Sequence, residues 1–244
     1  EDLPDYAVLD LKMEGDSGLV LLPKLLELDG EMRVVILTGY SSIATAVEAI
    51  KRGEKAIVAI FEKRPNDYLR TTPQGPAFEQ LVKEKKLEVI YLRPLDLSID
   101  ETLVELQNAV RRLGARRAVI DSLSGLELAL APTFREDFRE SLYRMMGALT
   151  GLGVTVMATV ELEDAYNGLK FSPQGIAFLT DAIIIQRYVE IDGHIRRALA
   201  VVKVRSSQHS KQLREYDISS KGELVVGGVL DGYEGLLAGT PKRT

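Results

Sequence analysis

The stretch V-V-I-L-T-G-Y-S-S, Val34–Ser42, reads as a buried strand that runs into a turn of glycine and hydroxyl residues. Helical periodicity over Ile43–Arg52 follows directly, and Gly53 ends it. A strand, a turn and a helix form the unit that binds phosphate when the turn has the sequence G-x-x-x-x-G-K-[ST]. That motif occurs nowhere in the chain. The turn therefore has the right position for a phosphate loop but lacks the lysine that holds the terminal phosphates.

Strand-like and helix-like segments alternate over the first two thirds of the chain. The predicted strands are Tyr6–Leu11, Arg33–Leu37, Ala56–Phe61, Leu87–Leu92, Arg117–Asp121 and Val154–Leu162. Two capping boxes, Ser98–Glu101 and Thr133–Glu136, predict helices that end at Gly114 and at about Gly151. This alternation predicts an α/β fold with a doubly wound, mostly parallel sheet.

The last third of the chain has a different pattern. Ala182–Glu190 and His194–Arg205 flank Asp192-Gly193, a dipeptide typical of a two-residue β-hairpin. Arg214–Ile218 and Glu223–Val226 add short strands, so we expect an antiparallel extension. Gly-rich residues 227–244 read as a loosely packed tail. Because the sequence has neither a linker nor a low-complexity segment, we expect one continuous domain over residues 1–244.

Composition narrows the class of protein. Of the 244 residues, 45% are hydrophobic and 27% charged, as in ordinary globular proteins. The net charge of −5 gives no reason to expect nucleic acid as a partner, and the absence of cysteine excludes disulfides and thiolate metal sites. No apolar run predicts a membrane span or a signal peptide, so we expect a cytoplasmic protein. Its opening with Glu1 rather than Met would fit a trimmed or engineered chain.

The first fifty residues carry one set of family motifs. These are P-D-Y-A-V-L-D-L-K-M-E-G-D-S-G-L (4–19), V-V-I-L-T-G-Y (34–40) and I-A-T-A-V-E-A-I-K-R-G (43–53). They resemble the receiver domain of two-component response regulators, which has a CheY-like, flavodoxin-like fold. The resemblance implies that Asp10 accepts a phosphoryl group and that Thr38 senses it. The acidic pair that holds Mg²⁺ in receivers has no counterpart here, so the alternative for Asp10 is a strand-end acid that caps nearby amides.

A second set of motifs runs from Arg52 to the C-terminal region. These are R-G-E-K-A (52–56), F-E-K-R-P (61–65), R-R-A-V-I-D-S-L-S-G (116–125), L-T-D (179–181), K-V-R-S-S-Q-H (203–209) and R-E-Y-D-I-S (214–219). They resemble the RecA-like ATPase domain of the circadian-clock KaiC family. Together the two resemblances imply a receiver-like β-α-β-α segment over 1–53 joined to a KaiC-like, P-loop NTPase-type core over 54–244 that lacks its Walker A motif.

The second resemblance assigns roles to two acids. Ala118–Ser122 is similar to a Walker B strand, which implies that Asp121 holds Mg²⁺. Glu62 matches the first of two glutamates that polarise the attacking water in this family. Lys63 stands at the second position, and its pairing with Glu62 would lower the basicity of that carboxylate. The structural alternatives are an acid at a sheet edge for Asp121 and an exposed charge cluster for Glu62.

A basic segment near the C-terminus matches the family as well. Lys203, Arg205 and His209 correspond to a strand that, in relatives, reaches the neighbouring subunit's nucleotide within a hexameric ring. Strand alternation places Lys203 and Arg205 on one face, which suits contact with one polyanion. The alternative is a solvated basic edge strand. Ala177 and Phe178 stand where autokinase members carry a Ser-Thr pair, so self-phosphorylation of that kind is not expected.

The residues that replace the phosphate loop are Thr38, Gly39, Ser41 and Ser42, which offer hydroxyls and the weak anion site of a following helix. Each lost charge-assisted phosphate contact weakens binding by about 1.5–3 kcal/mol. We therefore expect no bound cofactor, with Mg²⁺ and ATP, or another anion, held weakly at most. A ring that lacks nucleotide between its subunits loses that contact, so we expect a monomer or dimer.

Three hypotheses of function follow. The first is an engineered chimera of receiver and KaiC-like segments that tests fold compatibility and has no catalytic activity. The second is an enzyme that retains weak ATP binding or hydrolysis through Asp121 and Glu62. The third is a natural, degenerate receiver–KaiC fusion that signals by binding partners. Calorimetric titration with Mg²⁺ and ATP separates the first two hypotheses.

Overall fold

A computed structural model of the chain describes residues 6–10, 33–37, 53–62, 64–67, 75–92, 98–130, 137–161, 176–205, 207–219, 224–238 and 241–244. The chain divides into two compact units. The hairpin unit comprises Glu1–Gly39, Asp164–Pro173 and Thr180–Thr244, and the core unit comprises Tyr40–Glu163 and Gln174–Leu179.

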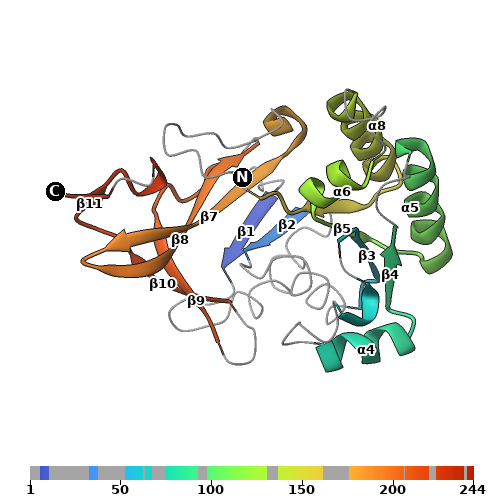
Figure 1. Ribbon diagram of the computed structural model, residues 1–244, viewed down its shortest axis with the longest axis horizontal. Helices are drawn as coiled ribbons and strands as arrows, with labels where there is room; N and C mark the ends of the chain where they lie inside the picture. The colour runs from blue at the N-terminus through green and yellow to red at the C-terminus, as the bar shows by residue number, and fades with distance from the viewer. Residues whose placement is uncertain are drawn as a thin grey trace, which may run out of the picture. The chain divides into compact units, whose positions relative to one another are not determined.

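The core unit contains a four-stranded parallel sheet in the order β4-β3-β5-β6 (Figure 1). The strands are β3 (Ala56–Ile60), β4 (Leu87–Tyr91), β5 (Arg117–Asp121) and β6 (Thr155–Ala158). All five residues of β3 are buried, as expected for a strand covered on both faces of a parallel sheet. The α/β class predicted from the alternating pattern is confirmed.

Helices cover both faces of this sheet. They are α4 (Gly75–Lys83), α5 (Ile99–Leu113), α6 (Leu123–Ala129) and α8 (Phe138–Thr150). One face of β3, with Ile57 and Ala59, packs in the same cluster as apolar residues of α5, α6 and α8. The other face, with Val58 and Ile60, packs with Phe78 of α4. The sheet is therefore doubly wound, because successive crossover helices lie on opposite sides of it.

The first predicted capping box is confirmed at the start of α5. The backbone N–H of Glu101 donates to the Ser98 hydroxyl at 3.1 Å, and that hydroxyl donates to the Glu101 carboxylate at 3.0 Å. Gly114 ends the helix with φ 68°. Thr133–Glu136, the second predicted box, lies outside the described residues, and α8 begins after Asp137.

Two helices of the core unit were not expected from the sequence. Helix α4 begins at Gly75-Pro76, a pair that reads as a turn, although proline is also favoured in the first helical turn. Helix α6 contains Gly125 close to its start, which weakens the helical signal. None of the helices that the structure describes is both long and apolar enough to cross a membrane.

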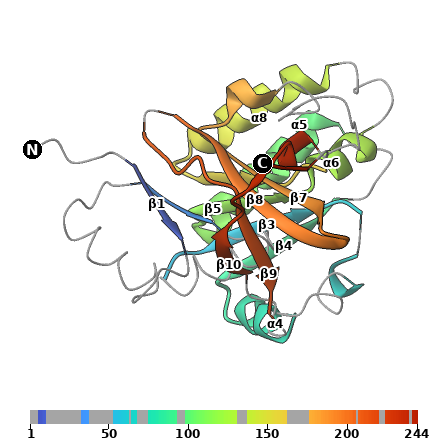
Figure 2. The same cartoon turned by 90° about the vertical axis from the view of Figure 1, so that its left-hand side faces the viewer.

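The hairpin unit contains an antiparallel sheet in the order β10-β9-β8-β7 (Figure 2). Its strands are β7 (Ala182–Ile191), β8 (His194–Val204), β9 (Arg214–Ile218) and β10 (Leu224–Val229). Asp192 and Gly193 join β7 to β8 with φ of 50° and 74°. Positive φ at both central residues is the signature of a type I′ turn, so the predicted hairpin is confirmed. In a separate pair, β1 (Tyr6–Asp10) runs parallel to β2 (Arg33–Leu37).

The expectation of a loosely packed tail is wrong. Strand β11 (Tyr233–Glu234) pairs with β12 (Lys242–Arg243), and a short 3₁₀ turn, Leu236–Ala238, lies between them. Leu236 is only 3% exposed and packs with the inner residues of the β7–β8 hairpin. The Tyr233 hydroxyl donates to Asp192 Oδ2 at 2.6 Å. The burial of Leu236 and this hydrogen bond therefore hold the C-terminal segment against the hairpin, although its many glycines had suggested loose packing.

Candidate functional site

The order of strands in the core unit creates a switch point between β3 and β5. From β3 the chain crosses to β4 on one side, and it then returns to β5 on the other. In parallel α/β sheets, ligands bind at the carboxyl ends of strands where the winding direction reverses, because the crossover helices leave a crevice there. The residues that follow these two strands, Phe61-Glu62 and Ser122, are thus at the position where a ligand site is expected.

Glu62 is held at this switch point by α6. Its Oε1 lies 3.3 Å from the Ser122 hydroxyl, which can donate to it, and the same hydroxyl accepts from the Gly125 N–H at 2.9 Å. A Cβ on Gly125 would lie 2.6 Å from Glu62 Oε1. Gly125 is therefore required for the carboxylate to lie against the first turn of α6.

Asp121 is oriented from the opposite side by β6. Its Oδ1 accepts a hydrogen bond of 2.8 Å from the Thr159 hydroxyl. The Thr159 backbone N–H donates to Ile120 O at 3.1 Å, and its carbonyl accepts from the Leu123 N–H at 2.8 Å. The Asp121–Ser122 peptide bond is cis. Three strand ends, those of β3, β5 and β6, thus contribute polar groups to one short segment of the sheet edge.

The donor set has a defined chemical capacity. Two carboxylates and two hydroxyls are hard oxygen ligands, and Mg²⁺ is commonly held by one or two carboxylates together with substrate phosphates and water. The described residues contain no group of three or more His, Asp or Glu side chains arranged to hold a metal ion by themselves. The residues present therefore fit Mg²⁺ that arrives with a nucleotide rather than a stand-alone metal centre.

Comparisons with known proteins agree with this geometry. Residues 42–228 match the family described as ATPase: KaiC. The chain belongs to the KaiC family. It is 30% identical over 196 residues to the circadian clock protein KaiC3 of Synechocystis, a match that covers 80% of this chain and 38% of that protein. It is 27% identical over 218 residues to the clock oscillator protein KaiC of Acaryochloris marina, covering 86% of this chain and 41% of that protein.

A solved structure supports the same fold. The KaiC-like protein of the archaeon Pyrococcus horikoshii aligns with a TM-score of 0.65 and 22% identity, covering 91% of this chain and 88% of that one. The chain spans about two fifths of the length of the two curated relatives named above. The similarity therefore extends over most of this KaiC-family chain but over a minor part of those relatives.

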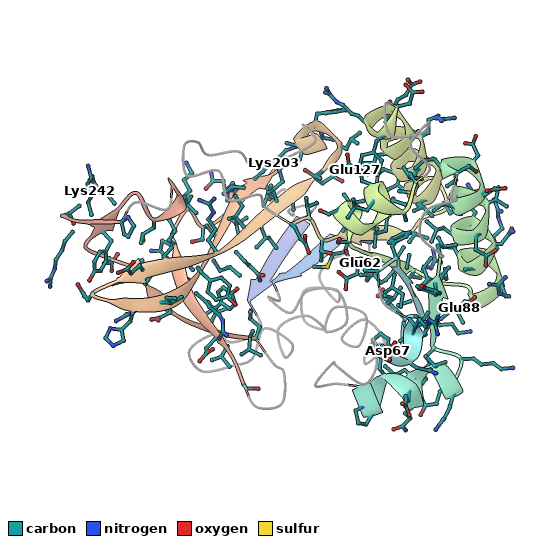
Figure 3. All side chains as sticks on the ribbon, viewed as in Figure 1. Glu62, Asp67, Glu88, Glu127, Lys203 and Lys242 are labelled. Carbon is teal, nitrogen blue, oxygen red and sulfur yellow. The ribbon has the colours of Figure 1, made fainter. Side chains whose placement is uncertain are left out.

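The three basic residues predicted to contact nucleotide, Lys203, Arg205 and His209, lie in the hairpin unit of this KaiC-family chain. The Lys203 ammonium donates to Thr180 O at 2.6 Å, and Arg205 Nη1 lies 3.2 Å from Asp181 Oδ1 (Figure 3). The Arg205 backbone N–H also donates to Asp181 O at 2.7 Å. Both side chains therefore contact the turn that precedes β7 in their own chain. His209 lies further along, in the connection from β8 to β9.

The structure says little or nothing about several of the predicted site residues. Thr38, Gly39, Ser41, Ser42 and Lys63 lie outside the described residues. Asp10 is the last residue of β1, and its backbone pairs with Leu37, the last residue of β2. The roles predicted for these residues, and for Lys203, Arg205 and His209, stay predictions.

Sequence reasoning missed Ser122, Gly125 and Thr159 as residues of the site. Ser122 and Gly125 stood inside a matched motif but carried no assigned role. Thr159 was placed within the predicted strand Val154–Leu162, although β6 ends at Ala158. One signal in the sequence could have identified Thr159. It is a hydroxyl residue directly after a parallel strand, and that strand pairs with β5, which resembles a Walker B strand.

Proposed function

We propose that this KaiC-family chain retains the acidic half of an ATPase site without its cationic half, and that it does not turn over ATP. The observation that carries the proposal is the sequence T-G-Y-S-S at Thr38–Ser42, which stands where the family resemblance places the phosphate loop. It offers neither the lysine nor the glycine-lined nest of N–H donors that a triphosphate requires. The family match begins at residue 42, immediately after most of this turn.

If Mg²⁺ and ATP did bind, the chain's own acids would have defined tasks. Mg²⁺ supplies charge neutralisation at the phosphates when bound. Asp121 would hold the ion, with its carboxylate oriented by the Thr159 hydroxyl. Glu62 would accept a proton from the attacking water, and Ser122 would keep its carboxylate at the strand end.

The second part of the proposal concerns the origin of residues 1–53. The receiver-like motifs over 4–53 favour a chain in which a receiver-type β-α-β-α segment replaces the corresponding part of a KaiC core, as in a chimera that tests fold compatibility. A natural receiver–KaiC fusion would have the same motifs.

Residual binding of Mg²⁺ and ATP is the second candidate function. The specific observation that favours it is the set of hydrogen bonds around Glu62 and Asp121 at the switch point. These hydrogen bonds support a position for both carboxylates at the switch point, although the lysine of the phosphate-loop motif is missing from the sequence.

Phosphate release from ATP in the presence of Mg²⁺ tests the proposal. We expect wild type, Asp121→Ala and Glu62→Gln to release phosphate at the same background rate. Release by wild type that disappears in both variants would show that the site turns over ATP, and would establish the second candidate instead.

A further inference from the structure

Within the part of the chain that the structure describes, no strand pairs with the outer edge of β4 in the core unit. Among the strands that the structure describes, β4 pairs only with β3 and so ends the sheet. The printed ladder bonds at its two ends, Ala56 N–H to Lys86 O at 3.0 Å and Leu92 N–H to Ile60 O at 3.2 Å, come from even-numbered residues of this segment. Backbone direction alternates along a strand, so the N–H and C=O groups of Val89 and Tyr91 point away from β3.

A hollow of about 450 Å³ runs beside this edge. Five consecutive residues, Glu88–Leu92, line it from β4, and Glu101, Thr102 and Glu105 line it from α5. The hollow therefore combines an exposed strand backbone with side chains of a neighbouring helix. Natural proteins commonly protect such edges with lysine, proline or a bulge, and β4 has none of these within Leu87–Tyr91.

The two sides of the edge differ in chemistry. On the α5 side the described lining of the hollow is acidic, because Glu88, Glu101 and Glu105 line it. Arg112 ion-pairs with Glu88 and Glu105. On the α4 side, Val89 and Tyr91 are half-buried and pack with the apolar cluster around Phe78. Among these described residues, three carboxylates against one guanidinium give the α5 side a net negative charge.

We propose that the outer edge of β4 binds an extended peptide in which basic and apolar residues alternate. The backbone of such a peptide would add a strand to the sheet through Val89 and Tyr91, since main-chain hydrogen bonds supply affinity in this mode of recognition. Its side chains would point alternately to the two faces. Lysine or arginine would then meet the acidic α5 side, and valine or another apolar residue would meet the α4 side.

The probe is a fluorescein-labelled hexapeptide, Lys-Val-Lys-Val-Lys-Val, whose binding is followed by fluorescence anisotropy at low salt. The control peptide, Lys-Lys-Lys-Val-Val-Val, has the same composition and charge but cannot present one residue type to each side. We expect the alternating peptide to bind at least about tenfold more tightly than the block peptide. Equal affinities would overturn the proposal, because charge alone would then account for binding.

Two variants locate the site. Val89→Pro removes an N–H on the outer side and leaves the ladder to β3 intact, so the variant should fold and lose binding of the alternating peptide. Glu105→Lys should weaken binding by about tenfold at low salt. Glu79→Lys, the same charge change on the exposed face of α4, should leave it unchanged.

The folding of Val89→Pro determines which variants test the proposal. Circular dichroism shows whether Val89→Pro is folded, and if it is not, the pair Glu105→Lys and Glu79→Lys decides the result. Binding that survives Val89→Pro in a folded protein, or that falls equally in both lysine variants, would contradict addition of a strand at β4.

Discussion

Glu62 Oε1 lies 3.3 Å from the hydroxyl of Ser122, and this contact joins the carboxyl ends of β3 and β5. The same hydroxyl caps the first turn of α6, so one serine fixes both a helix terminus and a candidate catalytic carboxylate. An added Cβ on Gly125 would lie 2.6 Å from Glu62 Oε1, so a side chain there requires the carboxylate to shift. The described contacts of Glu62 thus come from Ser122 and the first turn of α6.

Replacement of Gly125 tests this contact. An alanine in a helix is usually about 0.5–1 kcal/mol more favourable than glycine, and Gly147→Ala in α8, where a Cβ meets nothing within 4 Å, should show that gain. Gly125→Ala should lack the gain, because Glu62 must move and give up its hydrogen bond to Ser122. Urea unfolding measures the two free energies of unfolding.

The control for Gly125→Ala is a double variant. In a Glu62→Ala background the carboxylate is gone, so Gly125→Ala should stabilise the protein as much as Gly147→Ala does. An equal stabilisation by the two alanines in the wild-type background would mean that Glu62 does not lie against α6.

The hydrogen bond between Thr159 and Asp121 gives a second prediction. Thr159→Val removes the donor at 2.8 Å and should lower the free energy of unfolding by about 1–3 kcal/mol, since the acceptor is a partly buried carboxylate. The matched control is Thr150→Val on the exposed surface of α8, where the hydroxyl bonds only to main-chain carbonyls and its loss should cost less than about 0.5 kcal/mol. Equal effects in chemical denaturation would show that Thr159 does not support Asp121.

The contact between Tyr233 and Asp192 predicts a dependence on pH. The hydrogen bond to the Asp192 carboxylate raises the pKa of Tyr233, because a phenolate beside a carboxylate is disfavoured. A tyrosine pKa raised above its unfolded value of about 10 stabilises the fold fully below pH 10, and the contribution is lost as pH rises through the folded value.

The pKa of Tyr233 can be measured from the absorbance of its phenolate. The titration curve of Tyr233→Phe is subtracted from that of the wild type to isolate this residue. Asp192→Asn keeps a residue that tolerates positive φ and should lower the pKa of Tyr233 towards the ordinary value. An unchanged titration curve in Asp192→Asn would contradict the hydrogen bond.

The oligomeric state follows from the proposed loss of nucleotide. The family resemblance implies a ring with nucleotide between its subunits, and in this chain Lys203 and Arg205 contact Thr180 and Asp181 of their own hairpin unit. We expect a monomer or dimer in size-exclusion chromatography with light scattering. A hexamer in the absence of nucleotide would refute this reasoning.

Apolar patterning and turn chemistry predicted much of the fold. The bounds of β2 and β5 agree with the prediction, because the apolar run of each is followed in the sequence by a polar residue, Thr38 or Asp121. Helix α4 was missed because Gly75-Pro76 can begin a helix as readily as a turn. Leu236 was missed because its burial depends on the β7–β8 hairpin, which is remote in sequence.

The site was predictable only in part. Glu62 and Asp121 stand at strand ends, where the sequence pattern and the family resemblance agree. Gly125 and Thr159 act through contacts with residues 63 and 38 positions away, and no spacing rule reports such pairs. The roles of Gly125 and Thr159 therefore depend on tertiary packing. Glu62 and Asp121, in contrast, could be identified from the local sequence.

Restoring the missing cation tests the cause of the proposed inactivity. Tyr40→Gly with Ser41→Lys converts T-G-Y-S-S into T-G-G-K-S, which restores the end of the phosphate-loop motif. One charge-assisted contact of about 1.5–3 kcal/mol should tighten ATP binding by about 10–100-fold. Glu79→Lys, which adds positive charge elsewhere, should not. An unchanged affinity in the double variant would mean that this turn does not face the nucleotide.

Isothermal titration of the wild-type chain with ATP and Mg²⁺ tests the central claim most directly. A turn without its lysine predicts binding that is absent or millimolar. Micromolar binding that is lost in Asp121→Ala would show a competent nucleotide site and contradict the account.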